Sequence, residues 1–285
     1  MIATARRLRR FALDDRTLRA FFDVAAQTAI QRLEYVPYAR FVLARQLDDA
    51  AGGGLGARLR DIVQDRDRGG FTFASGDATA DDCVRLATAV AHLLGPANHD
   101  AMSGTYYARF IVRDDDASDS YLRQAYVPLT LHTDGTYVDE PTDWILMMKL
   151  AERNARGGET RVLHLDDWDE LDAFASHPLA SQPYRFQGPP SKNAPHPVHR
   201  PVFFERDGHP CMAYIDQFAY PETLEQGLYL DALTRSLEAS PGVATVDLAP
   251  GDGIVLNNAF WLHGRAAFER HPDLFRELLR ERGRF

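Results

Sequence analysis

Residues 130–140 read TLHTDGTYVDE, a β-prone run that reaches His132, skips one residue to Asp134 and breaks at a glycine. In a strand, residues two apart point to the same face, so this imidazole and this carboxylate can be presented together. A second His-x-Asp occurs at His164 and Asp166. The pattern alone therefore leaves open which pair binds a metal ion, if either does.

The residues after the second pair offer a structural explanation for it. Asp167 is followed three residues later by Glu170, which is the spacing of a capping box at the start of a helix. We therefore expect Asp166 and Asp167 to begin a helix. No helical run follows Asp134, so a metal site and an Asx-turn both remain open there.

A third candidate ligand lies in residues 250–265, PGDGIVLNNAFWLHGR, where a predicted turn and strand lead to His263. Taken alone, a histidine at a strand end is an ordinary core residue. Two histidines and one carboxylate, with the third ligand distant in sequence, are typical of the facial triad of non-haem Fe(II) oxygenases. The same set suits Zn²⁺ with a water as fourth ligand, so a zinc hydrolase is an alternative.

The segment RELLRERGRF, residues 276–285, contains several arginines. Two readings of the segment are open. From Asp273 onward, the apolar residues recur at helical spacing. If instead the helix turns into a strand, Arg280 and Arg282 would lie on one face. A buried arginine is costly unless it is paired with an anion, and a planar guanidinium matches a carboxylate in bidentate fashion. The segment therefore predicts either a carboxylate-binding site or a solvated surface.

Composition limits the class of protein. The 285 residues are 45% hydrophobic and 26% charged, which allows a sizeable core without disulfides. A net charge of -9 argues against nucleic-acid binding but not against a small anionic ligand held by local arginines. Cys83 and Cys211 form no disulfide framework or zinc-finger spacing, and no apolar run approaches the roughly 18 residues of a membrane span. We expect a cytoplasmic protein.

The order of the predicted elements favours an α+β fold. The first hundred residues are mostly helical, and the remainder is rich in short strands separated by Gly, Pro, Asp and Asn. This order indicates a jelly roll, or double-stranded β-helix, with flanking helices. We expect a single domain over 1–285, with a helix-rich part at 1–100 and the jelly-roll core at 101–285.

The individual elements follow from hydrophobic periodicity and turn residues. The expected helices cover residues 16–36 (capped by Asp15), 57–67, 78–95, 167–177 and 222–240, and the expected strands cover residues 69–75, 105–112, 126–132, 144–150, 160–165, 202–205, 212–215, 244–248 and 253–258.

Several longer motifs occur in one order along nearly the whole chain. They are LATAVAHLLG (86–95), DAMSGTYYARF (100–110), HTDGTYV (132–138), GGET (157–160), LHLDDW (163–168), PPSKN (189–193), YIDQF (214–218), NNAFWLHGR (257–265) and HPDLFRELLRERG (271–283). With these motifs the chain resembles the carbon-starvation-induced glutarate 2-hydroxylase family, Fe(II)- and 2-oxoglutarate-dependent dioxygenases of the clavaminate synthase/taurine dioxygenase-like group.

The resemblance implies a reaction and its cofactors. Glutarate, 2-oxoglutarate and O2 would give 2-hydroxyglutarate, succinate and CO2, with Fe(II) as the metal and 2-oxoglutarate as cosubstrate. A related dioxygenase acting on another small carboxylate or sulfonate is the nearest alternative, and a non-catalytic barrel used for ligand sensing or protein binding is another. The resemblance also implies a homotetramer. From the absence of a long apolar run we expect no membrane partner.

The resemblance assigns roles to individual residues. The metal ligands would be His132, Asp134 and His263. Thr160 would contact 2-oxoglutarate through its hydroxyl. Of the terminal arginines, Arg282 would bind 2-oxoglutarate and Arg280 the substrate, with Arg276 able to enter the same pocket instead. A substrate wall is expected from Ser103, Tyr107 and Arg109.

The two ends of the chain depart from the expected family pattern. Family members are expected to continue for a short distance past the arginine segment, whereas this sequence stops at Phe285. We therefore expect less support for the last strand and for closure of the pocket. The N-terminal region is also shorter than expected, with an effect on subunit packing.

Overall fold

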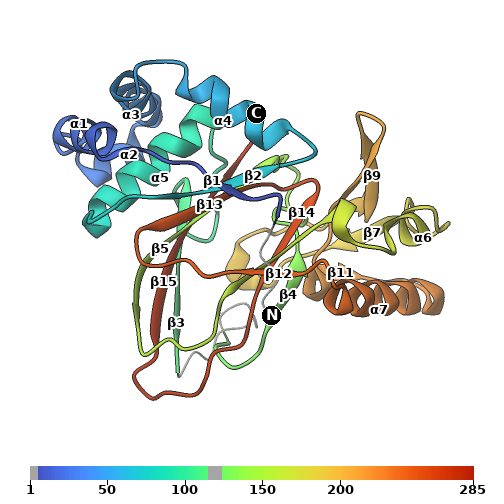
Figure 1. Ribbon diagram of the computed structural model, residues 1–285. Coiled ribbons are helices and arrows are strands. Elements are labelled where there is room, and N and C mark those ends of the chain that lie inside the picture. The colour runs from blue at the N-terminus through green and yellow to red at the C-terminus, as the bar shows by residue number, and fades with distance from the viewer. Residues whose placement is uncertain (1–5, 115–123) are drawn as a thin grey trace.

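In the computed structural model, which describes residues 6–114 and 124–285, a six-stranded sheet faces a four-stranded sheet (Figure 1). The larger sheet has the order β1 (Arg9–Arg10), β2 (Gly70–Ala74), β13 (Asp252–Asn257), β5 (Trp144–Arg153), β15 (Phe275–Gly283) and β3 (Tyr107–Arg113). The smaller has the order β12 (Ala244–Val246), β6 (Thr160–His164), β14 (Trp261–Arg265) and β4 (Leu129–His132). Except for the parallel β1–β2 pair, neighbouring strands in both sheets are antiparallel.

The two sheets bury a common core. Met147 of β5, Ile254 of β13 and Val162 of β6 belong to one cluster of buried side chains between them. Two antiparallel sheets packed in this way with helices to one side form a jelly roll. The predicted α+β class with a jelly-roll core is confirmed.

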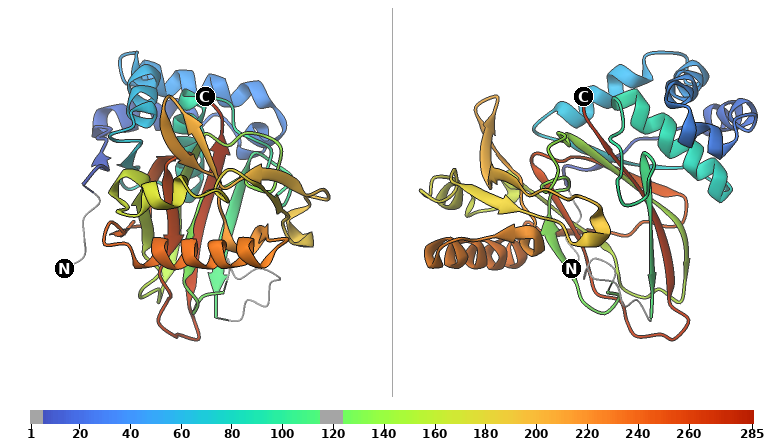
Figure 2. Two further views of the ribbon diagram at one scale, coloured as in Figure 1. Left: turned by 90° about the vertical axis from the view of Figure 1, so that its right-hand side faces the viewer. Right: turned by 180° about the vertical axis from the view of Figure 1, so that it is seen from behind.

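Five helices lie on the outer side of the larger sheet, where the last two contact its strands and the first three pack against the fifth (Figure 2). They are α1 (Asp15–Ala25), α2 (Ile30–Tyr35), α3 (Pro37–Ala50), α4 (Leu55–Gln64) and α5 (Ala80–Leu94). A second core forms here, in which Val90 of α5 packs with Leu146 and Met148 of β5. Strand β5 is thus buried on both faces, which explains why it reads as an unbroken apolar run rather than an alternating one.

The N-terminal helices differ from the sequence prediction in detail. Asp14, not Asp15, caps α1 by accepting a hydrogen bond from the Thr17 N–H at 2.7 Å. The single helix expected over 16–36 is divided into α1 and α2, and the following helix α3, which begins with Pro37 at its first position, was not predicted.

The remaining elements lie on the far side of the smaller sheet, where Figure 1 shows α7 and β9 away from α1–α5. They are the sheet β11 (Ala219–Tyr220), β7 (Pro183–Phe186) and β8 (Val198–Pro201), the hairpin β9 (Phe203–Arg206) and β10 (His209–Met212), the helices α6 (Leu171–Ala175) and α7 (Leu224–Ala239), and the 3₁₀ turns η2 (Leu165–Asp167), η3 (Pro190–Lys192) and η4 (Asp216–Phe218). In the described part of the chain, no helix combines the length and apolar character required to cross a membrane.

The arginine segment forms strand β15, so Arg280 and Arg282 lie on one face as the helix-to-strand reading predicts, and the helix considered from Asp273 is absent. The strand pairs with β3 on one side and β5 on the other. The sequence misled because β15 is covered on both faces: Leu279 packs against the helices while Leu278 lies in the core between the sheets. Adjacent leucines then match a helical pattern as well as a strand.

The helix-facing side of β15 carries a buried acid. Glu281 is fully buried, accepts a hydrogen bond from the Thr88 hydroxyl at 3.3 Å and lies 4.0 Å from His92 Nδ1. Burial raises the pKa of Glu281 to about 8 and lowers the pKa of His92 to about 4. Both groups are therefore neutral in the folded protein at neutral pH.

Replacement of this acid by its uncharged amide, Glu281→Gln, should change how stability depends on pH. Folded Glu281 keeps its proton up to about pH 8, whereas an unfolded glutamate loses it near 4.5, so the free energy of unfolding falls as pH rises through this window. Between about pH 6.5 and 8, where histidines contribute little, urea titrations should show a decline on the order of 2 kcal/mol that the variant lacks. The exposed control Glu269→Gln should decline like the wild type. Parallel profiles for wild type and Glu281→Gln would contradict the assignment.

Candidate metal centre and active site

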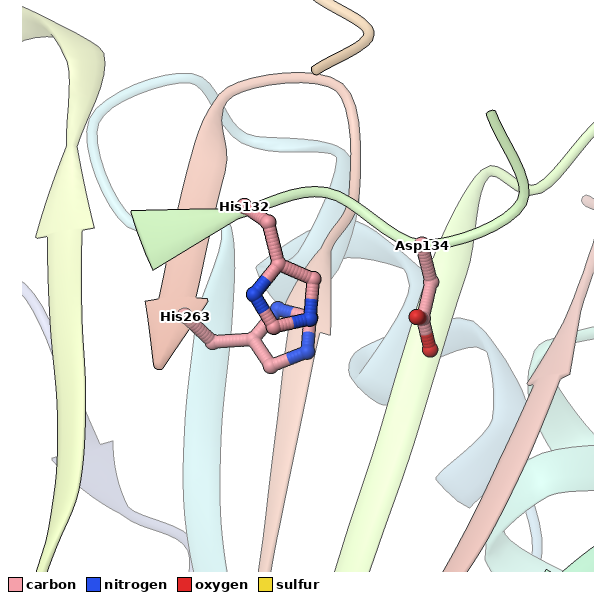
Figure 3. Close-up of side chains that lie close together, drawn as sticks. All are labelled: His132, Asp134 and His263. Atoms are coloured by element: carbon pink, nitrogen blue, oxygen red, sulfur yellow. The ribbon is translucent and has the colours of Figure 1, made fainter. Parts of the chain in front are cut away.

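His132, Asp134 and His263 come together on the inner face of the smaller sheet. His132 ends β4 and is the direct cross-strand partner of His263 in β14, and their ring centroids are 4.2 Å apart. Asp134 follows in the turn after β4, and one ligand atom from each residue lies within 4.8 Å of the others. Figure 3 shows both imidazole rings pointing toward the Asp134 carboxylate. The spacing-based prediction that these residues share a site agrees with this geometry.

The turn that carries Asp134 is fixed by hydrogen bonds from distant segments. Asn258 accepts from the Asp134 N–H at 2.8 Å and donates from Nδ2 to the Asp134 carbonyl at 2.9 Å. Thr133 pairs with Tyr214 through both backbone and hydroxyl. Gly135 has φ +77, and a Cβ there would collide with the Thr142 side chain. Glycine is therefore required after the aspartate.

Asn258 was not identified as a site residue from the sequence. The sequence feature that could have identified it is its place in the asparagine pair that precedes His263 in the NNAFWLHGR motif. The structure gives this position a physical reason, since the amide joins the end of β13 to the turn that presents Asp134.

Arg280 of β15 holds the Asp134 carboxylate. Its Nη1 donates to Asp134 Oδ2 at 2.9 Å, and its Nη2 donates to Asp100 Oδ2 at 2.6 Å. Burial alone would raise the pKa of Asp134, but the Arg280 charge holds it well below its usual range. The carboxylate is thus ionised and oriented, as metal binding requires.

The two histidines are also prepared for metal binding. The Nδ1 atom of His132 lies 2.8 Å from the Thr130 carbonyl, an interaction that fixes the tautomer and leaves Nε2 for a metal. Burial lowers the pKa of His263 to about 3, so its ring is neutral. Within the described residues, His263 Nδ1 is buried without a hydrogen-bond partner. Two imidazoles and one carboxylate are the ligand set of a facial Fe(II) triad, so these residues would fit that metal.

The second His-x-Asp pair has a structural role, although not the one predicted. His164 is completely buried; its Nε2 lies 2.9 Å from the Arg66 carbonyl and its Nδ1 accepts from the Asp166 N–H. The expected capping box is absent, because α6 starts only at Leu171 and its cap residue, Glu170, makes no side-chain cap bond. Asp167 instead forms ion pairs with the N-terminal arginines Arg6 and Arg7. Arginines from distant segments form ion pairs with these aspartates. The local spacing of residues does not predict such contacts.

A cavity between the sheets opens onto the three candidate ligands. Its lining includes Thr160 and Arg276 beside the triad, with Arg280 on the same strand as Arg276. Residues four apart on a strand are separated by roughly 13 Å, so the two arginines occupy different ends of the cavity. Thr160 pairs with Arg265, two residues along β14 from His263. Thr160 and Arg276 therefore belong to the end away from Asp134.

Arg276 is a buried cation at that end. Burial lowers its pKa to about 10, which still leaves the guanidinium charged at neutral pH. No hydrogen-bond partner for its Nε is found among the residues described by the structure. The guanidinium lies 5.9 Å from the ring centroid of Phe268, which also faces Arg265.

None of the three residues of the predicted substrate wall lines this cavity. The Tyr107 hydroxyl donates to Glu34 in the helical layer at 2.6 Å. Arg109 is largely exposed and pairs with Glu277 at 2.7 Å, and Ser103 is exposed. The same motif does contribute Phe110 to the lining, because strand alternation turns this residue inward.

Arg282 also lies outside this cavity. It is buried at the wall of a neighbouring cavity that shares Tyr137, Lys192 and Arg280 with the first. The structure therefore separates Arg276 and Arg282, the two arginines considered for the same ligand.

Comparison with known proteins identifies the family. The family model described as CsiD matches residues 2–285. The chain belongs to the CsiD family. Curated relatives of this CsiD-family protein include the glutarate 2-hydroxylases of Salmonella paratyphi B and Salmonella newport, each 47% identical over 274 residues that cover 94% of this chain and 84% of the relative.

Solved structures show the same fold in more distant proteins. An asparagine oxygenase in complex with Fe(II), 3-hydroxyasparagine and succinate matches with a TM-score of 0.74 at 17% identity, over 96% of this chain and 93% of that one. The non-heme iron oxygenase OrfP in complex with Fe, succinate and (3S)-hydroxy-L-Arg matches with a TM-score of 0.73 at 19% identity, with the same coverage. At these identities the likeness establishes the shared fold.

Matched aspartate-to-asparagine substitutions in the two His-x-Asp pairs should show which pair binds the metal and which has a structural role. Asp134→Asn should weaken Fe(II) binding at least tenfold, because an anionic ligand is lost and even supporting residues are worth that much. Asp166→Asn should bind Fe(II) like the wild type, because Asp166 pairs with Arg66 away from the cavity. Anaerobic equilibrium dialysis measures both affinities, with circular dichroism to check folding. Equal losses in the two variants would contradict the assignment.

Proposed function

We propose that this CsiD-family protein is an Fe(II)- and 2-oxoglutarate-dependent hydroxylase that converts glutarate, 2-oxoglutarate and O2 into 2-hydroxyglutarate, succinate and CO2. The observation that carries the proposal is the His132/Asp134/His263 cluster on an arginine-lined cavity in a chain 47% identical to glutarate 2-hydroxylases. When bound, the metal supplies the coupling of 2-oxoglutarate decarboxylation to O2 activation, and the protein orients the two acids.

The far carboxylate of 2-oxoglutarate is assigned to Arg276 and Thr160 rather than to Arg282. Arg276 and Thr160 line the same cavity as the triad, whereas Arg282 does not. A charged guanidinium with an unpartnered Nε in a buried cavity is suited to a carboxylate, and a neighbouring hydroxyl adds a further donor. Arg265, also in the lining, contributes a second positive charge at this end.

Arg280 is assigned a positioning role together with a contact to substrate. Two of its nitrogens hold Asp134 and Asp100, and its Nε is buried without a partner in the described part of the chain. It lines both cavities, so its remaining donor can reach an acid placed beside the metal. Apolar side chains, including Phe110, Met147 and Leu278, line the first cavity and exclude water from the reacting carbon.

The alternatives predict different uses of the arginines. A zinc hydrolase with the same triad has no need of a buried cation at the Arg276 end, whereas a 2-oxoglutarate enzyme does. A related dioxygenase acting on another small acid keeps every residue named so far and differs only in the acid that stimulates turnover. The 47% identity to glutarate 2-hydroxylases favours glutarate.

Three further features are proposed on the strength of the family resemblance. The protein is assigned a homotetrameric state, a cytoplasmic location and a single domain over residues 1–285. The last is supported by β2, which comes from the helix-rich part yet pairs with β13 in the larger sheet. Sedimentation equilibrium measures the subunit number, and cell fractionation measures the location.

The reaction is tested by mixing anaerobic protein with Fe(II) and 2-oxoglutarate, recording the visible charge-transfer band, and then admitting O2 with and without glutarate. We expect the band to form and glutarate to stimulate succinate production. Succinate stimulated by another small acid instead would identify a related dioxygenase. No band and no stimulated succinate would contradict the proposed function, and turnover that ignores 2-oxoglutarate would favour the hydrolase.

A further inference from the structure

Strand β4 contains a β-bulge directly before His132. In its pairing with β14, the two residues Thr130 and Leu131 lie opposite the single residue Gly264. A Cβ on Gly264 would lie 2.5 Å from the Leu129 carbonyl oxygen, so glycine is required opposite the bulge. Bulges are frequent beside active sites, where the extra residue changes the direction of a side chain.

The bulge turns His132 toward the first cavity. Leu129 and His132 both line this cavity, although they are three residues apart in the sequence. In a regular strand, residues three apart point to opposite faces of the sheet, so one extra residue is needed between them. The orientation of this metal ligand therefore depends on how the peptide group between Thr130 and Leu131 is held.

That peptide group links His132 to a carboxylate on helix α7. Its carbonyl belongs to Thr130 and accepts a hydrogen bond from His132 Nδ1 at 2.8 Å. Its N–H belongs to Leu131 and donates to Glu238 Oε1 at 2.7 Å. Because β4 is the edge strand of the smaller sheet, the carboxylate takes a place that the N–H of a further strand could otherwise occupy.

Glu238 is itself held in position. Its second oxygen, Oε2, accepts a hydrogen bond from Arg161 Nη1 at 2.6 Å. Arg161 belongs to β6, and β14 lies between β6 and β4 in the smaller sheet. The carboxylate is thus tied to an inner strand of the sheet that carries the metal ligands, and it cannot turn away from Leu131 without loss of this ion pair.

Helix α7 also holds the residue on the other side of His132, and Figure 1 shows this helix next to β4. The Tyr214 carbonyl accepts from the Thr133 N–H at 2.8 Å, and the Tyr214 N–H donates to the Thr133 hydroxyl at 2.9 Å. The Tyr214 hydroxyl in turn lies 2.6 Å from the Thr234 hydroxyl in α7. Both sequence neighbours of His132 are therefore positioned from α7.

We infer that Glu238 is a positioning residue for the metal ligand His132, to which the Thr130–Leu131 peptide connects it. Histidine ligands commonly donate their second nitrogen to a carboxylate, which fixes the ring and strengthens the nitrogen that binds the metal. Here a peptide group lies between the two. A charged acceptor on its N–H polarises the peptide and makes its carbonyl a stronger acceptor for His132 Nδ1. The inference rests on the proposed function, whose three metal ligands it takes as the site.

Loss of this carboxylate should weaken metal binding. Glu238→Leu should bind Fe(II) about 10-fold to 100-fold more weakly than the wild type, the range typical for partners of histidine ligands. Glu238→Gln keeps an oxygen that can accept from the Leu131 N–H but loses the charge, so its affinity should lie between the two. Anaerobic equilibrium dialysis measures the three affinities. If Glu238→Leu does not fold, the comparison of Glu238→Gln with the wild type carries the test.

A second measurement follows the hydrogen bond of His132 itself. In protein loaded with Zn²⁺, which is diamagnetic and is bound by the same residue types, ¹⁵N-labelled histidine allows the proton resonance of His132 Nδ1–H to be recorded. The resonance should move upfield from wild type to Glu238→Gln and further to Glu238→Leu, because the bond to the Thr130 carbonyl weakens. A contribution of Glu238 to folding stability alone would leave this resonance in place.

Two control variants on α7 separate the positioning role from a general effect on the helix. Glu225→Leu removes the same charge from the first turn, roughly 20 Å along the helix from Glu238, and should bind Fe(II) like the wild type. Leu233→Ala truncates a fully buried side chain of the same helix. It should lower the unfolding temperature but, in the folded protein, keep the wild-type affinity for Fe(II).

The possible failures are distinguishable. If wild type binds Fe(II) and hydroxylates glutarate while Glu238→Leu matches it in affinity and in the His132 resonance, the positioning role alone is overturned. Equal losses of affinity in Glu238→Leu and Leu233→Ala would also overturn it, because they would indicate a general effect of α7. Wild-type protein that binds no Fe(II) and forms no stimulated succinate would overturn the proposed function together with the role of Glu238.

Discussion

The buried contact of Arg280 with Asp134 is the interaction on which the rest of the site depends. It joins a central strand of the larger sheet to the turn after β4 in the smaller sheet, with Asp100 as the second acceptor. A buried ion pair adds little net stability, but loss of one partner typically costs about 3–5 kcal/mol because a charge is left uncompensated. The contact therefore specifies the geometry: it brings the two sheets into register at the metal ligands and keeps the Asp134 carboxylate ionised.

Strand β15 carries this contact because it is central and covered on both faces. Its inner side presents Arg276, Leu278 and Arg280 to the first cavity, and its outer side places Glu281 against the helical layer. Such a strand is held by neighbours β3 and β5 and by both cores, so its side chains vary little in position. Two arginines spaced along one strand, Arg276 and Arg280, provide cations at different distances from the metal ligands, which is what a reaction between two small acids requires.

The sequence predicted the jelly roll and the association of His132, Asp134 and His263. Strand alternation is a local pattern and the family motifs occur in a fixed order, so both can be recognised without knowledge of long-range packing. The sequence failed where long-range packing decides the outcome. The segment with Leu278 and Leu279 matched a helix as well as a strand because both faces of β15 are buried. Asp167 was read as a helix cap because its partners, Arg6 and Arg7, are distant in sequence. The sequence also did not predict which arginine lines which cavity, because this depends on long-range packing of each side chain.

The most direct test of this account is a crystal structure of the anaerobic complex with Fe(II), 2-oxoglutarate and glutarate, with the metal located by anomalous scattering. We predict iron within bonding distance of His132, Asp134 and His263, and the far carboxylate of 2-oxoglutarate on Arg276. Iron bound elsewhere, or 2-oxoglutarate anchored by Arg282, would contradict the account.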